Sequence, residues 1–303
     1  MLADRILKGN EEAMKKIIGI IMCFVFLCLI FVSCNPPVQQ LPEQPIKLIV
    51  RGDDMGSTHS CNLAVKQGFE EGILTCASLI VPSPWFEEAA SMCLENPHWS
   101  IGVHLTLNSE WRGYRWKPIL PVTEVPTLVD EDGYFYPTEE AFLEADPDLG
   151  EVEKELRAQM ELALKRNIDV QYIDTHMGTA RATPELHVIV KKICQDYRLP
   201  LSQEVGEERL SIYEVHFSKK EKALAEQLQQ IGPGLWLLVI HPGLDTLEMR
   251  ALVDINPEGL PSVAANRAAV TRAITGNRIK KIIKQRNIQL VDYSEQRNRI
   301  RSE

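Results

Sequence analysis

Six carboxylate and imidazole side chains stand within or directly after apolar, strand-like stretches of the sequence. They are Asp53, Asp54, His104, Asp174, His176 and His241. Carboxylates are costly to bury unless they are paired or bind a metal, and histidine changes its charge near neutral pH, which suits proton transfer. One carboxylate with two imidazoles is a common open zinc set that leaves a position for water or substrate. The six residues therefore predict acid–base chemistry, metal binding, or both.

Each of these residues also has a structural interpretation when it is taken alone. Asp53 and Asp54 could lie in a turn and cap the next helix, His104 could be a buried, hydrogen-bonded histidine, and His241 could close a strand before Pro242. Their coincidence favours a site, because the ends of successive strands in a parallel (β/α) sheet converge on one face. At such a site, Asp174 would accept the second ring N–H of a metal-bound histidine.

Strand-like and helix-like stretches alternate from residue 46 onward. Strands are expected at 46–50, 75–81, 100–107, 170–173, 235–240 and 288–293. Helices are expected at 62–71, 86–95, 150–167, 184–197 and 262–286, the last with a break at Gly276-Asn277. The alternation predicts an α/β fold in which helices cover a parallel sheet. Roughly 250 residues fit a (β/α) barrel, regular or incomplete, and a doubly wound open sheet is the alternative.

Residues 108–147 interrupt this alternation with a long segment rich in aromatic and acidic side chains. Trp111, Tyr114 and Trp116 lie within six residues of one another. Long loops in compact domains are usually functional or disordered, and flat aromatic rings commonly stack on sugars. We therefore expect Trp111, Arg115 and Trp116 to bind substrate, with core packing for the rings and a solvated position for the arginine as the alternatives.

Charge and cysteine content exclude some classes of function. The net charge is −9, and no long basic run follows residue 40, which argues against a nucleic-acid partner. Four cysteines follow residue 34 without a CxxC pair, so a cysteine-rich zinc site is not expected. They are Cys61, Cys76, Cys93 and Cys194. Export would permit a disulfide, but small buried side chains are the better interpretation for most of them.

The first 45 residues carry the pattern of an export signal and a tether. Lys15 and Lys16 precede an apolar run at 17–32, which is shorter than the ~20 residues of a membrane-spanning helix. The end of this run, at 31–34, resembles a bacterial lipobox with Cys34 as the lipidated residue. An uncleaved membrane anchor is the alternative, and translation could begin at Met14.

These features divide the chain into four parts. They are an export signal at 1–33, a Pro/Gln-rich tether at 34–45, a catalytic domain at 46–296 and a polar tail at 297–303. The protein is accordingly expected to be an exported lipoprotein, anchored in the membrane of a bacterial cell envelope. The oligomeric state stays open, with a dimer among the states considered.

The motifs together resemble the YdjC-like carbohydrate deacetylase family, which is similar in fold and chemistry to the polysaccharide deacetylases. The resemblance extends from Leu48 to Tyr293. It rests on Asp53-Asp54-Met55-Gly56 with Asn62, Gly72-Ile73-Leu74-Thr75 with Ser78-Leu79, Gly102-Val103-His104-Leu105-Thr106-Leu107, Asp174-Thr175-His176 and His241-Pro242-Gly243.

The resemblance implies a role for each matching residue. Asp54, His104 and His176 match the metal ligands, Asp53 the general base, and His241 the proton donor to the leaving amine. The implied reaction is the removal of N-acetyl groups from amino-sugar oligosaccharides with a divalent metal. Zinc suits two imidazoles and one carboxylate best, with cobalt, nickel, iron or magnesium as alternatives.

The sequence also departs from the family pattern. Gly178 stands where many members carry a second histidine, Ser202-Gln203-Glu204 stands where many carry an arginine, and the loop 108–116 is divergent. The substrate therefore stays open. A carbohydrate O-acetyl esterase, a glycan-binding lipoprotein without catalysis and a structural envelope protein are the rival interpretations.

Overall fold

The computed structural model describes residues 8–11, 14–20, 22, 44–257 and 259–302. The chain forms two units, Met1–Glu43 and Gln44–Glu303, and the second holds the sheet and its covering helices. Cys34 and most of the predicted signal and tether lie outside the described residues. Within the described part of the chain, no helix has the length and apolar character needed to cross a membrane.

Seven parallel strands form one sheet in the second unit. They are β1 (Ile46–Met55), β2 (Cys76–Leu79), β3 (Ser100–Leu105), β4 (Val170–Thr175), β5 (Glu208–Leu210), β6 (Gly234–Ile240) and β7 (Gln289–Leu290). Their order is β4-β3-β2-β1-β6-β5, with β7 paired to β1. The predicted α/β fold with a parallel sheet is confirmed.

One stretch of chain connects the two ends of this strand order. Leu201 forms a parallel bridge with Ile173 of β4, and a few residues later β5 pairs with β6. The strands are therefore compatible with the expected barrel. The sheet is irregular, because β5 and β7 are very short and β1 has a third partner in β7.

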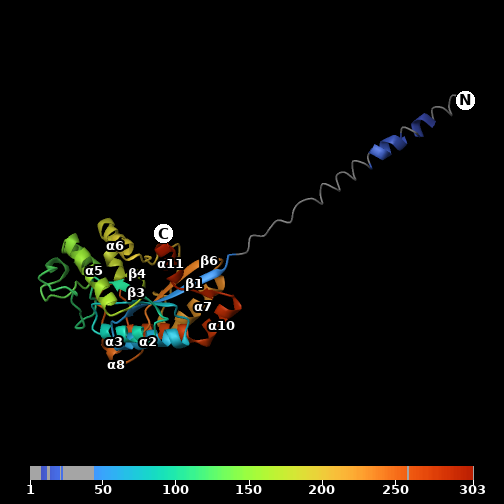
Figure 1. The fold of residues 1–303 in the computed structure, drawn as a ribbon. Helices are drawn as coiled ribbons and strands as arrows, with labels where there is room; N and C mark the ends of the chain where they lie inside the picture. The colour runs from blue at the N-terminus through green and yellow to red at the C-terminus, as the bar shows by residue number, and fades with distance from the viewer. Residues whose placement is uncertain (1–7, 12–13, 21, 23–43, 258, 303) are drawn as a thin grey trace. The chain divides into compact units, whose positions relative to one another are not determined.

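Helices lie around the strands (Figure 1), with α2 and α3 below, α5 and α6 at the upper left, and α7 and α10 at the right. The α-helices are α2 (His59–Glu71), α3 (Phe86–Glu95), α4 (Glu139–Glu144), α5 (Leu149–Lys165), α6 (Pro184–Tyr197), α7 (Lys220–Gln230), α8 (Leu247–Ala251), α9 (Val263–Thr275), α10 (Asn277–Gln285) and α11 (Ser294–Ser302). Three short 3-10 helices are η1 (Pro126–Leu128), η2 (His176–Arg181) and η3 (Phe217–Lys219).

Local signals placed the longer helices well. The bounds of α3 and α6 match the predicted ranges, and the predicted break at Gly276-Asn277 separates α9 from α10. Thr58 and Thr183 cap α2 and α6 through their side-chain oxygens. Elements α4, α7, α8 and β5 were not expected from the sequence, and most of them are too short for a clear periodic pattern. Helix α11 continues across residue 296, and Arg297 within it pairs with Asp169.

Strand β1 is longer than expected because its polar residues are buried and paired. The prediction ended the strand at residue 50, but β1 continues to Met55 through Arg51, Asp53 and Asp54. All three of these side chains are buried. A buried charge needs a partner. The charged residues that led to a predicted strand end at residue 50 find such partners in the folded protein.

A small cluster inside the sheet packs apart from the main core. It consists of Ile49, Cys76, Tyr172, Leu237 and Tyr293. The rings of Tyr172 and Tyr293 lie 4.3 Å apart. All four cysteines of the second unit are free and buried, which confirms their interpretation as small core side chains.

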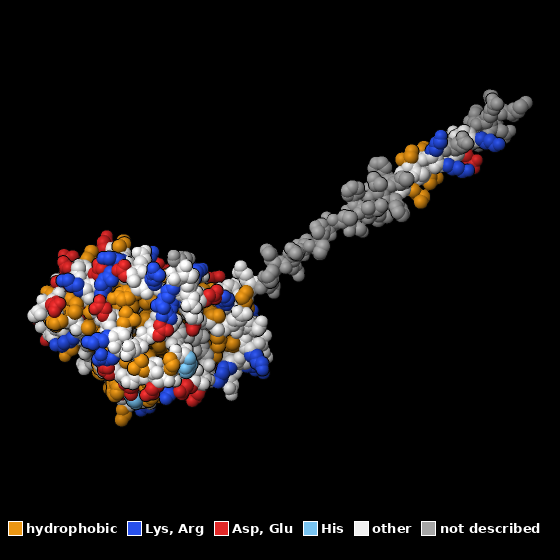
Figure 2. All heavy atoms as spheres, in the orientation of Figure 1, with side chains coloured by type: hydrophobic (Ala, Val, Ile, Leu, Met, Phe, Trp, Pro, Cys, Tyr) orange, Lys and Arg blue, Asp and Glu red, His pale blue; other side chains and the backbone are white. Residues whose placement is uncertain are grey.

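The visible surface of the second unit carries both signs of charge. Figure 2 shows Lys and Arg side chains interspersed with Asp and Glu rather than gathered into one basic patch. A mixed surface of this kind is typical of globular proteins in water.

Candidate active site

The ends of β1, β3 and β4 bring together the three residues predicted to bind a metal. Asp54 Oδ1 lies 3.6 Å from His104 Nε2 and 3.4 Å from His176 Nδ1. One donor atom from each residue lies within 4.8 Å of the other two, and all three residues are buried. A parallel sheet explains this convergence, because its strands end on the same face.

The geometry of Asp54 fits a divalent cation. Its Oδ1 is buried and has no hydrogen-bond partner among the described residues, although it faces both imidazoles. Burial opposes its ionisation, but the guanidinium of Arg267 holds the pKa of Asp54 well below its ordinary value. An ionised oxygen and two ring nitrogens around one point form a donor set that suits a metal.

Each predicted ligand has an outer partner from another part of the chain. Arg267 Nη2 of α9 lies 2.5 Å from Asp54 Oδ2. Asp174 Oδ2 lies 2.9 Å from His104 Nδ1, and Glu110 Oε2 lies 3.0 Å from His176 Nε2. Outer carboxylates of this kind orient histidine ligands and fix their tautomers. The remaining ring nitrogens, His104 Nε2 and His176 Nδ1, are the ones that face Asp54.

The surroundings of His176 favour its charged form when no metal is bound. Burial opposes the imidazolium, but the carboxylates of Glu110 and Asp54 outweigh burial and raise the pKa of His176 to about 10. The metal-free site therefore holds a proton that a cation would have to displace.

Asp53 lies beside this set but is paired differently. Arg51 donates from Nε to Asp53 Oδ1 and from Nη2 to Asp53 Oδ2, both at 2.7 Å. Asp53, His104 and Asp174 form a second group of donors within 4.8 Å of one another. Arg51 Nη2 also lies 3.0 Å from Asp174 Oδ2, so the guanidinium of Arg51 pairs with both carboxylates of that group. Asp54 also pairs with an arginine, but its Oδ1 has no hydrogen-bond partner among the described residues, whereas both oxygens of Asp53 are bonded, so the Asp54 group fits a metal better.

His241 directly follows β6, which neighbours β1 on the side opposite β2. It lines the same site as Asp54 and His176. It is half-buried, and its ring lies 5.5 Å from the ring of Tyr213. Burial lowers the pKa of His241, although the nearby Asp54 and Asp53 act in the opposite direction. A hydrogen bond from Gly243 N to Thr271 Oγ1, 3.0 Å long, holds the turn that follows.

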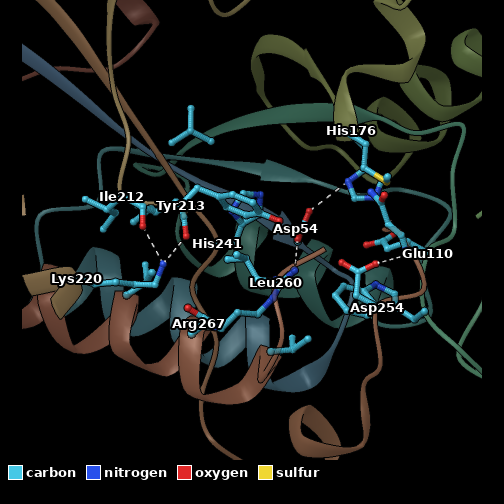
Figure 3. Close-up of a pocket in the computed structure, with 18 of the residues that line it drawn as sticks. Asp54, Glu110, His176, Ile212, Tyr213, Lys220, His241, Asp254, Leu260 and Arg267 are labelled. Carbon is cyan, nitrogen blue, oxygen red and sulfur yellow. Dashed lines mark hydrogen bonds and ion pairs between the residues drawn. The ribbon is translucent and has the colours of Figure 1, made fainter. Parts of the chain in front are cut away.

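A pocket of about 450 Å³ opens over these residues, a size within the usual range for small-ligand sites. Its lining includes Asp54, Glu110, Trp111, His176, Tyr213, His241 and Arg267. Figure 3 shows Asp54 between His176 and Arg267, with an interaction drawn to each. The lining thus combines two candidate ligands, a candidate acid and two aromatic rings.

Similarity to known proteins agrees with this geometry. The YdjC-like protein family model matches residues 47–285. The chain belongs to the YdjC-like family. It is 28% identical over 262 residues to a carbohydrate deacetylase of Brevibacillus brevis, covering 82% of this chain and 99% of the relative. It is 35% identical over 232 residues to a carbohydrate deacetylase of Thermus thermophilus, covering 68% and 81%.

A solved structure shares the fold over nearly its whole length. It is a crystal structure of an Enterococcus faecalis V583 protein whose name refers to cellobiose-phosphate cleavage. The TM-score is 0.69 at 25% identity, and the alignment covers 83% of this chain and 99% of that one.

All six polar residues identified in the sequence lie within the range matched by the YdjC-like family.

The divergent loop of this YdjC-like protein places its three predicted substrate-binding residues in different surroundings. Trp111 lines the pocket, and the guanidinium of Arg267 lies 5.4 Å from its ring. Arg115 instead pairs with Asp130 at 2.6 Å, and Trp116 Nε1 donates to the Asn108 carbonyl at 2.8 Å. These contacts hold the loop itself. Substrate binding by Trp111, Arg115 and Trp116 stays a prediction.

The other two departures from the family pattern, at Gly178 and at residues 202–204, have local structural correlates. Gly178 has a φ of 82°, a backbone region that favours glycine, with open space around it. Ser202 Oγ accepts a 2.6 Å hydrogen bond from Arg51 Nη1. Ser202, at the first position after residue 201, is thus a hydrogen-bond acceptor for Arg51 of β1.

Sequence reasoning missed three charged residues of this YdjC-like site: Arg51, Glu110 and Arg267. Arg51 had a signal, because an arginine inside an apolar strand and next to two carboxylates needs a partner. Glu110 lies in the loop that was read for its aromatic residues, and Arg267 lies in a helix with no distinctive spacing. Only the packing of distant segments brings Glu110 and Arg267 to the ligands.

Proposed function

We propose that this YdjC-like protein is a metal-dependent hydrolase that removes N-acetyl groups from amino-sugar oligosaccharides. The observation that carries the proposal is the buried set of Asp54, His104 and His176, with Asp53 and His241 beside it and a pocket above it. The carbohydrate deacetylases among its relatives support the same reaction class.

Asp54, His104 and His176 would hold a divalent metal. Such a metal, when bound, supplies Lewis acidity that polarises an acyl oxygen and lowers the pKa of water. Two imidazoles and one carboxylate suit zinc best, cobalt, nickel or iron next, and magnesium less well.

The chain's own residues would move the protons. Asp53 accepts the proton of the attacking water, since it is a buried carboxylate next to the ligand set. His241 donates a proton to the nitrogen, because an amide nitrogen leaves poorly without one. Burial lowers the pKa of His241, and Asp54 and Asp53 partly restore its affinity for the proton that it would donate.

The pocket supports a sugar as the substrate. Trp111 and Tyr213 offer aromatic rings in its lining, and sugars pack their apolar faces on such rings. Glu110, Asp254 and Asn256 add polar groups to the same lining, which suits the hydroxyls of a carbohydrate. An acetylated oligosaccharide fits both features.

Acetate release from N-acetylated chitooligosaccharides tests this proposal. A soluble chain of residues 35–303 would be stripped of metal with a chelator and then supplied with zinc, cobalt, nickel or magnesium. We expect release only after metal is restored. Release from O-acetylated but not N-acetylated sugars would replace the proposal with the esterase reaction, and failure to bind metal would favour a glycan-binding protein.

We also propose that the protein is an exported lipoprotein anchored through Cys34. The basic residues, the apolar run and the lipobox-like end of the first 34 residues support this location. It would place the hydrolase at the bacterial cell envelope, where acetylated glycans are available.

A further inference from the structure

We propose that Arg51 is the residue that positions Asp53 for proton transfer, an inference that rests on the proposed deacetylase function. Arg51 and Asp53 lie on the same strand, two residues apart, so their side chains project to the same face. A role through Asp53 would make Arg51 a positioning residue.

Arg51 and Asp53 form a bidentate pair. Nε and Nη2 of Arg51 each donate to a different oxygen of Asp53, at 2.7 Å in both cases. The exposed fraction is 2% for Arg51 and 3% for Asp53. Two parallel bonds hold the plane of a carboxylate, which one bond from a lysine cannot do. Each oxygen keeps a further lone pair with which Asp53 can accept a proton.

Other contacts hold the guanidinium itself in place. Nη1 donates to Ser202 Oγ at 2.6 Å, and Nη2 lies 3.0 Å from Asp174 Oδ2. Ser202 in turn bonds the hydroxyl of Tyr293, which donates to Glu207 Oε1 at 2.9 Å. All three nitrogens of Arg51 therefore have partners, and its position is determined by β1, β4 and the segment after residue 201.

Arg51 also connects the predicted base to the predicted metal ligands. The same guanidinium contacts Asp53, the predicted base, and Asp174, the outer partner of the predicted ligand His104. Burial opposes the charge, but Asp174 and Asp53 raise the pKa of Arg51 well above its ordinary value. The arginine is thus a permanent cation between two carboxylates that would otherwise repel each other.

A double-mutant cycle separates positioning from mere packing. Turnover, KM, bound metal and thermal stability would be measured for full-length protein carrying Arg51→Lys, Arg51→Met, Asp53→Asn or Arg51→Met with Asp53→Asn. If Arg51 acts through Asp53, Arg51→Lys lowers kcat at least about tenfold, since a displacement of 1 Å can cost about 10²-fold, while KM and bound metal stay unchanged. In the Asp53→Asn background, Arg51→Met causes no further loss.

The variants are chosen so that unfolding does not decide the result. Arg51→Met leaves two buried carboxylates unpaired, which can destabilise the fold, whereas Arg51→Lys keeps the charge. Arg181→Lys is the matched control, because Arg181 hydrogen-bonds Thr175 and Gln203 near the same site. We expect its kcat to stay within about twofold of wild type, a change of only about 0.4 kcal/mol in the activation free energy.

Three results would overturn the inference, and only the third also overturns the proposed function. A folded, metal-loaded Arg51→Lys variant with wild-type kcat contradicts it while the deacetylase function stands. The same holds if Arg51→Met is as damaging in the Asp53→Asn background as in the wild type. A metal-loaded wild type that releases no acetate from any acetylated sugar overturns the proposed function first, and the inference with it.

Discussion

Asp53 and Asp54 are neighbours in the sequence but have different partners. Both oxygens of Asp53 bond Arg51, whereas Asp54 bonds Arg267 through Oδ2 and leaves Oδ1 facing two imidazoles. Asp54 also has a φ of 70°, an uncommon value for a residue other than glycine. This backbone turn directs the two carboxylates to different partners.

Replacing each aspartate separately should therefore give different losses. Asp53→Asn should lower kcat by about 10²–10⁴-fold, the usual contribution of a general base, and keep one bound metal. Asp54→Ala should lose the metal as well as turnover. Metal per chain, measured by mass spectrometry beside acetate release, distinguishes them. Near-full activity of Asp53→Asn would show that another residue is the base.

Glu110 should tune the affinity for metal through His176. Its Oε2 lies 3.0 Å from His176 Nε2, so Glu110→Gln should weaken metal binding by about 10–100-fold, as loss of an outer partner does. Titration with zinc measures this. Glu139→Gln, which removes a carboxylate from the lining of the same pocket, is the control. Equal affinities of the Glu110 and Glu139 variants would contradict the role.

Metal binding should release a proton from His176. Its pKa is raised to about 10 in the metal-free protein, above the ordinary value of 6.5. The charge of His176 therefore stabilises the metal-free fold fully below about pH 6.5, and this contribution is lost as the pH rises through about 10. At pH 7, a ligand imidazole must give up that proton.

Calorimetry of zinc binding in buffers with different ionisation enthalpies counts this proton. We expect release of about one proton at pH 7 from His176, falling as the pH approaches 10. Binding that releases no proton at pH 7 would contradict the paired, charged state of His176.

Close packing between strands β3 and β4 sets the position of His104 and Asp174. Gly102 pairs in register with Tyr172, and His104 with Asp174. A Cβ on Gly102 would lie 2.4 Å from the Tyr172 ring. Since both residues lie in a close-packed interior, the ring has little room to move.

Gly102→Ala should consequently destabilise the protein by about 1–3 kcal/mol, as overpacking does. Chemical denaturation of this variant beside Gly232→Ala measures the difference, because no atom outside Gly232 and its two chain neighbours lies within 4 Å of a Cβ at that position. Similar stabilities for the two variants would show that β3 and β4 can separate without cost.

The long segment after β3 is an ordered part of the site. Ser109 N donates to the Tyr136 carbonyl, and Trp111 bridges to Asp254. Arg115 pairs with Asp130 and lies 5.2 Å from the Tyr134 ring. These contacts within the segment fix its backbone. They thereby hold Glu110 beside His176, although the segment has no regular secondary structure around Glu110.

At the scale of the whole molecule, the proposed location depends on Cys34. The full-length protein, expressed in a bacterium, should take up a labelled fatty acid and fractionate with membranes. Cys34→Ser should lose the label, and Cys93→Ser should keep it, because Cys93 is buried in the second unit. Label that persists in Cys34→Ser would show that the lipobox interpretation is wrong.

Much of the fold could be predicted from the sequence, because its signals are local. Apolar runs, glycines and prolines located the main strands and helices, and the polar residues at the strand ends indicated one site. The convergence of the six polar residues on one site follows from the sequence, since parallel strands end on one face, whereas the choice of Asp54, His104 and His176 as the ligand set came from the family resemblance.

The pairing of those residues was decided only by the tertiary structure. Glu110 meets His176, and Arg267 meets Asp54. Glu110 and Arg267 reach the site through a loop fold and a helix packing that no local pattern encodes. A buried charge selects its partner by distance and desolvation in the folded chain, and spacing along the sequence specifies neither.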